Sequence, residues 1–230
     1  MKISGLCLAA TFLTSTCLFA DLTIVQKIEG AGSTSEMMVK IKGDLIRVDP
    51  SPEISSIINN KTGEMITIMH PQKAFMKISG EQAKAMMAQA KGPNASTPAK
   101  SPELKATGEK ETIENTEGKF EAEKYTFTTA GGIKGTYWIV KNYPNAAKIL
   151  TEMSNMAKGP IGESMSAGVP DPTSLPGFPI KSTLEVTGQS PVTATVFSVK
   201  ETPISDADFK TPEGYQTMSM PGMGGEGKTK

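Results

Sequence analysis

Three blocks in which apolar and polar residues alternate constrain this chain more than any other feature, because a period of two is typical of strands with one buried face. The blocks cover residues 22–78, 108–141 and 180–202. Short connections that contain Gly, Asn or Asp divide them, for example KGD at residues 42–44 and NKTGE at residues 60–64. Such connections join neighbouring antiparallel strands, so we predict a series of hairpins in an antiparallel sheet.

Two segments have the period of an amphipathic helix instead. Apolar residues within 83–90 recur at i, i+3, i+4 and i+7, and Ser79 with Gln82 before them has the pattern of a capping box. A second helix is expected from about Pro144, where apolar side chains of residues 149–157 share one face. We therefore predict an α+β fold, in which a curved antiparallel sheet or incomplete barrel is covered by two amphipathic helices.

Residues 1–20 have the composition of a secretory signal peptide, because a positive residue precedes an apolar run that ends in Ala20. The run is short for a membrane-spanning helix, and polar Asp21 follows it. We expect cleavage after Ala20, so N-terminal sequencing of the exported protein should begin at Asp21. Recovery of an intact Met1 terminus, or of a lipid on Cys17, would contradict this prediction.

The rest of the chain is expected to form a single α+β domain over residues 21–216. Stretches rich in Pro, Gly and Ser at about residues 92–106 and 159–179 predict flexible loops within it. The Met- and Gly-rich residues 217–230 predict a disordered tail.

The composition excludes several kinds of site. Both cysteines, Cys7 and Cys17, lie in the predicted signal peptide, so the mature chain has no thiol for a disulfide, a metal or a nucleophile. The 24 basic and 24 acidic residues balance, which argues against nucleic-acid binding and electrostatic attachment to a membrane. Every basic residue except Arg47 is lysine, so clustered arginine sites for anions are excluded as well.

Neither a catalytic centre nor a metal or cofactor site is recognisable. His70 is the single histidine, and without a second catalytic partner it is expected to have a structural or surface role. Asp206 with Asp208, and Glu121 with Glu123, are carboxylates two residues apart, but neither pair has the spacing of a calcium loop. We expect these carboxylates to be solvated charges and the protein to be no enzyme.

Four segments carry a resemblance to a known family: GDLIRVD at residues 43–49, the following residues 57–78, FEAEKYTFTTAGGIKGTYWIVKNYPNA at residues 120–146, and ISDADFKTPEGY at residues 204–215. Together they resemble a bacterial secreted family known only as a domain of unknown function, number 4412. More distantly, the order of strands resembles the periplasmic lipoprotein carriers (LolA/LolB-like), which implies an incomplete barrel with helices lining a hydrophobic hollow. In the carriers an arginine near the mouth matters for cargo, and Arg47 lies on a comparable strand.

Methionine is abundant, with 14 residues, and thioether side chains repack easily around variable apolar ligands. The alternative is that they fill gaps in an ordinary core.

Phe209, isolated among charged residues, is expected to anchor the end of the sheet, or alternatively to contact a partner. The side chains expected at an apolar cavity are Met86, Met87, Trp138, Ile149 and Met153.

These features predict a non-enzymatic protein of the bacterial envelope, periplasmic or secreted, that binds a lipid or acyl chain between sheet and helices. It is expected to lack an integral membrane segment after signal cleavage. One alternative is an envelope interaction or structural protein with a filled core, which docks a protein partner through a face or loops. A secreted hydrolase is a more remote alternative.

Overall fold

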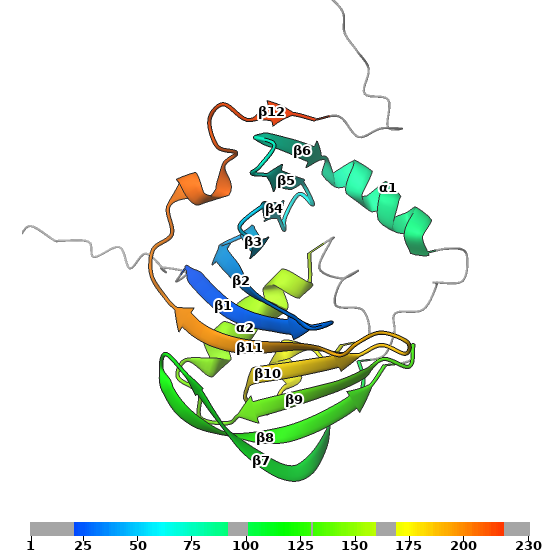
Figure 1. Ribbon diagram of the computed structural model, residues 1–230, viewed down its shortest axis with the longest axis vertical. Helices are drawn as coiled ribbons and strands as arrows, with labels where there is room; N and C mark the ends of the chain where they lie inside the picture. The colour runs from blue at the N-terminus through cyan, green and yellow to red at the C-terminus, as the bar shows by residue number, and fades with distance from the viewer. Residues whose placement is uncertain (1–20, 92–100, 130, 160–168, 219–230) are drawn as a thin grey trace, which may run out of the picture.

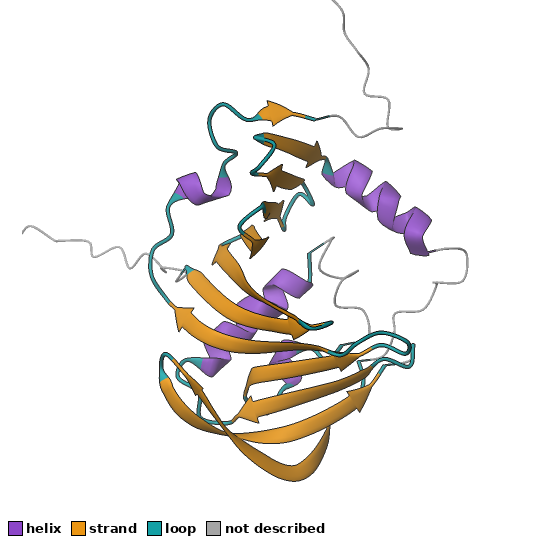
Figure 2. Cartoon of the chain, in the orientation of Figure 1, coloured by secondary structure: helices purple, strands orange, loops and turns teal. Residues whose placement is uncertain are grey.

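The alternating segments form one sheet, drawn as a ribbon in Figure 1 and coloured by element type in Figure 2. The computed structural model describes residues 21–91, 101–129, 131–159 and 169–218. The helices are α1 (Gly80–Lys91) and α2 (Ala146–Ala157), with 3-10 turns η1 (Pro172–Ser174) and η2 (Asp206–Phe209). The strands are β1 (Leu22–Gly30), β2 (Ser33–Lys42), β3 (Leu45–Ser51), β4 (Ile54–Asn59), β5 (Met65–Met69), β6 (Ala74–Ile78), β7 (Lys105–Asn115), β8 (Gly118–Thr128), β9 (Lys134–Val140), β10 (Phe178–Glu185), β11 (Val192–Lys200) and β12 (Gln216–Thr217).

The predicted fold class is confirmed, because the sheet is open, curved and almost entirely antiparallel. Its 12 strands lie in the order β12-β6-β5-β4-β3-β2-β1-β11-β10-β9-β8-β7. Strands β1 to β6 follow one another as the predicted hairpins, and β11 lies between β1 and β10. The single parallel pair joins β12 to β6. In the part of the chain that the structure describes, no helix is long and apolar enough to span a bilayer.

A β-bulge helps to curl the sheet. The register of β1 against β11 shifts at Val25 and Gln26, which leaves Phe197 of β11 as the extra residue. Its carbonyl oxygen instead accepts a hydrogen bond of 3.0 Å from the backbone amide of Thr116, in the turn between β7 and β8. This bond brings the far end of the sheet back against β11.

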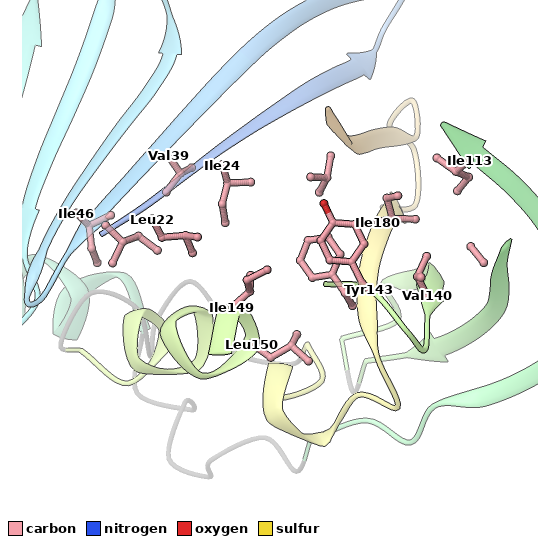
Figure 3. Close-up of a cluster of buried hydrophobic side chains, with 14 residues drawn as sticks. Leu22, Ile24, Val39, Ile46, Ile113, Val140, Tyr143, Ile149, Leu150 and Ile180 are labelled. Carbon is pink, nitrogen blue, oxygen red and sulfur yellow. The ribbon is translucent and has the colours of Figure 1, made fainter. Parts of the chain in front are cut away.

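The main core lies between one face of the sheet and α2, and Figure 3 shows side chains from both layers meeting there. We call this side of the sheet the α2 face. Tyr143 stacks on Phe178 with ring centroids 4.3 Å apart, and burial raises the pKa of Tyr143 to about 12. The buried members of the cluster are Leu22, Ile24, Val39, Ile41, Ile46, Ile113, Ala122, Val140, Tyr143, Ile149, Leu150, Phe178, Ile180 and Val196.

The start of each helix follows from local chemistry. The capping box before α1 is confirmed, because the Ser79 amide donates to Gln82 Oε1 at 2.9 Å and the Gln82 amide donates to Ser79 Oγ at 3.2 Å. Helix α2 begins at Ala146, slightly later than the expected Pro144, because Asn145 has a left-handed backbone with φ of 54°. Figure 1 shows α1 continuing from β6 away from the sheet, whereas α2 crosses it.

Three predicted boundaries are corrected by regular pairing. Strand β7 begins at Lys105 and β10 begins at Phe178, so the two loops end earlier than residues 106 and 179. Thr217, expected in the tail, pairs with Phe75 of β6. The predictions for residues 1–20, 92–100, 160–168 and 219–230 lie outside the described residues.

Candidate functional site

Side chains on the α2 face form two rows that run across the strands, of which the first is apolar throughout and the second is apolar except at Ser56 and Thr67. Because the rows follow the cross-strand register, their members share one face of the sheet. The first row, from β1 to β6, is Leu22, Ile41, Ile46, Ile58, Met65 and Ile78. The second is Ile24, Val39, Val48, Ser56, Thr67 and Met76.

Burial decreases along these rows from β1 to β5, whereas Ile78 at the β6 end of the first row is buried. On β1 and β2 the row members are buried beneath the helix. On β4 and β5 they are only half-buried, and Ile54 on the same face is 41% exposed. Apolar side chains therefore extend beyond the cover that α2 provides, on both sides of polar Ser56 and Thr67. We call its half-buried and exposed members the apolar strip: Val48, Ile54, Ile58, Met65, Met69 and Met76.

A pocket of about 390 Å³ adjoins the strip, between the β2–β3 turn and the C-terminal half of α2. Two of its lining residues, Ile41 and Ile46, belong to the first row, where Ile46 lies opposite Ile58 of the strip. The volume is within the usual range for small-molecule sites. The remaining lining residues are Gly43, Asp44, Asn60, Glu152, Asn155, Met156 and Lys158.

Asn60, in the NKTG turn between β4 and β5, forms hydrogen bonds that connect the parts of one wall of this pocket. Its backbone amide donates to the carbonyl of Asp44 at 2.7 Å, and its side-chain amide donates to the carbonyl of Asn155 in α2 at 2.8 Å. Gly159 lies against the same amide, and a Cβ there would overlap it. The turn, the neighbouring hairpin and the end of α2 therefore form one connected wall.

The side chains expected at an apolar cavity occupy several places. Ile149 is buried in the main core, and Met153 and Trp138 are half-buried against it. The Trp138 ring also lies 4.3 Å from Lys181 Nζ. Met86 is half-buried on α1, and the side chain of Met87 lies outside the described part of the chain.

The sequence patterns did not predict the apolar strip or the lining of the pocket. The one indication of the pocket in the sequence was Met156, which belongs to the predicted apolar face of the second helix. The other residues become neighbours only through cross-strand register.

On the opposite face, Arg47 connects the sheet to the C-terminal segment. Its Nε donates to Asp49 Oδ1 at 2.8 Å, one terminal nitrogen donates to the carbonyl of Asp208 at 2.8 Å, and the other donates to Ser55 Oγ at 3.0 Å. Lys40 Nζ adds an ion pair of 2.6 Å to Asp208 Oδ1. Together these contacts fasten η2 to β2 and β3.

His70 extends this network. Its Nε2 lies 2.8 Å from Ser55 Oγ and its Nδ1 lies 3.1 Å from the hydroxyl of Tyr215. A serine beside a histidine is also the arrangement of a nucleophile and its base. Here, however, Ser55 is 1% exposed and its oxygen accepts from Arg47, so the geometry matches the structural role expected for His70.

The paired carboxylates each contact a lysine, and the side chains of Asp206 and Glu121 remain 77% and 67% exposed, as expected for solvated charges. Asp206 lies 2.7 Å from Lys42 Nζ, whose hydrogen bond lowers the pKa of that carboxyl group. Glu121 and Glu123 pair with Lys110 and Lys141, each at 2.7 Å. Among the described residues, no three potential ligands gather in a way that can hold a metal ion.

A family model described as "Domain of unknown function (DUF4412)" matches residues 22–215. No curated protein matches the chain. The matching solved structures include a DUF1329 family protein from Desulfovibrio piger, with TM-score 0.29 and 10% identity over 83% of this chain and 90% of that chain.

Two other solved structures also match the chain. A putative outer membrane lipoprotein-sorting protein domain from Vibrio parahaemolyticus matches with TM-score 0.31 and 9% identity, over 83% of this chain and 89% of that chain. A LolA superfamily protein from Nitrosomonas europaea matches with TM-score 0.23 and 8% identity, over the same shares of 83% and 89%. Superpositions this weak assign no activity to the chain.

Proposed function

Because the chain belongs to the family described as a domain of unknown function (DUF4412), which assigns no activity, we propose a function from the site itself. The protein is a non-enzymatic, exported protein of the bacterial envelope that binds a lipid or acyl chain along the apolar strip. The observation that carries this proposal is the set of half-buried and exposed apolar side chains that lie beyond α2, on both sides of Ser56 and Thr67.

The chemistry of the strip supports an apolar chain as the ligand. All six members of the strip are aliphatic or thioether side chains, and three of them are methionines. Covering such surface is favourable by roughly 25 cal/mol per Å² removed from water. Methionine adapts to irregular partners, so this surface suits chains of varied length better than one rigid ligand.

One observation favours the alternative, in which the protein docks a protein partner. Phe197 is 54% exposed at the β-bulge of β11, and exposed aromatic side chains are frequent anchors of protein interfaces. Native mass spectrometry of the protein purified from the bacterial envelope separates the two functions. Co-purified lipid supports the first, whereas a co-purified protein and no lipid supports the second.

A charge on the strip should weaken the binding of an apolar chain. We expect Met76→Glu to weaken the binding of dodecyl maltoside, measured by calorimetry below its micelle concentration, by about ten-fold or more, because a carboxylate must lose water against an apolar chain. Lys77→Glu is the matched control, since the next residue of β6 is exposed and lies on the opposite face. Equal loss in both variants, or in neither, would contradict the strip as the binding surface.

A further inference from the structure

We propose that the pocket beside the apolar strip selects amphiphiles whose head group is zwitterionic, with an amine and a phosphate. This inference rests on the proposed function and deepens it. The strip would hold the chain and the pocket would hold the head group. The floor of the pocket supports the link, because Ile41 and Ile46 continue directly into the first apolar row.

The rim of the pocket carries charges of both signs. Asp44 and Glu152 contribute two carboxylates, and Lys158 contributes one ammonium group. Among the residues that the structure describes, none of these three makes an ion pair. Asp44 and Lys158 are exposed and Glu152 is half-buried, so all three are accessible to a ligand.

The C-terminal end of α2 supplies one of the two carboxylates. The helix ends at Ala157, and Glu152 and Asn155 of its last turns line the pocket. A helix C-terminus acts as about half a negative charge, but Lys158 at the C-cap opposes it, so the negative charge of the rim comes from the two carboxylates. An ammonium group is therefore favoured beside Asp44 and Glu152.

The rim has one positive charge, which lies at the same C-terminal end of α2 as Glu152. Lys158 follows the last residue of α2 as its C-cap, so its ammonium group can pair with a phosphate there. A head group that is only anionic would face two carboxylates, and one that is only cationic would face Lys158. A head group that carries both charges can pair with the carboxylates and with Lys158.

The test compares single-chain lipids that differ only in the head group. We expect the mature protein to bind lysophosphatidylethanolamine about ten-fold more tightly than lysophosphatidylglycerol with the same acyl chain, measured by calorimetry below the micelle concentrations. Glu152→Gln and Asp44→Asn should each reduce this preference by about three-fold. Glu81→Gln, an exposed acid on α1, is the control and should leave the preference unchanged.

The outcomes separate this inference from the proposed function. If both lysolipids and dodecyl maltoside bind equally well, and Glu152→Gln changes nothing, the head-group site is refuted and chain binding stands. A preference for lysophosphatidylglycerol also refutes the head-group site. If no amphiphile binds to the unmodified protein, the proposed function itself is refuted and the pocket selects nothing.

Discussion

Replacing Phe209 with alanine is expected to lower the free energy of unfolding by about 3–4 kcal/mol, because the change removes a buried ring and leaves a cavity. Phe209 is 8% exposed and packs against Ile57 and Ile68 of the sheet and against Ile204. This second cluster is separate from the main core and lies on the face opposite α2. The ring therefore holds the C-terminal segment onto the sheet.

Urea denaturation measures the effect of Phe209→Ala as a lower midpoint with an unchanged slope. Lys210→Ala is the matched control, because the neighbouring side chain is exposed and its loss should change the free energy by less than about 0.5 kcal/mol. An unchanged midpoint for Phe209→Ala would refute the anchor. It would instead support the prediction that Phe209 contacts a partner.

Arg47→Met is expected to lower the free energy of unfolding by about 2 kcal/mol, because three acceptors lose their charged donor at once. The Arg47 side chain is 18% exposed, so part of the cost of removing one partner of a buried pair is relieved by water. Arg47→Lys should lose most of the same stability. An ammonium group lacks the forked guanidinium donors, so it cannot bond to Asp49, Ser55 and the Asp208 carbonyl at the same time.

Lys27→Met is the control for Arg47→Met. Lys27 pairs with Glu29 at 2.8 Å on an exposed part of β1, and such pairs contribute less than about 1 kcal/mol. Limited proteolysis provides a second readout, since cleavage after residue 200 should accelerate for Arg47→Met alone. Equal stability of the two variants would show that Arg47 does not fasten the segment.

Much of the fold was predictable because the relevant signals are local. The alternation of residues 22–78 reflects a one-sided sheet, and the Ser79 and Gln82 pattern forms the capping box it predicts. Ser205 caps η2 in the same local way, because its hydroxyl accepts from the amide of Ala207 at 3.2 Å. Each of these features depends on residues a few positions apart.

The site was less predictable because it depends on register and on what covers a face. Periodicity indicated that Ile149 and Met153 lie on the apolar side of a helix, but not that this side is occupied by the core. The strip arises because Ile58 and Met65 lie beyond the cover of α2. Similarly, the wall of the pocket depends on Asn60 meeting Asn155, which no spacing in the sequence indicates.

The place of β11 between β1 and β10 affects when the chain can fold. Strands β1 to β6 and strands β7 to β10 are joined within the sheet only through β11, whose residues Val192–Lys200 are synthesised late. Until then β1 has an open edge, and the pairing that closes it spans most of the chain, which is slow to form. We therefore expect the emerging polypeptide to stay incompletely folded during translation, a state suited to threading through an export channel.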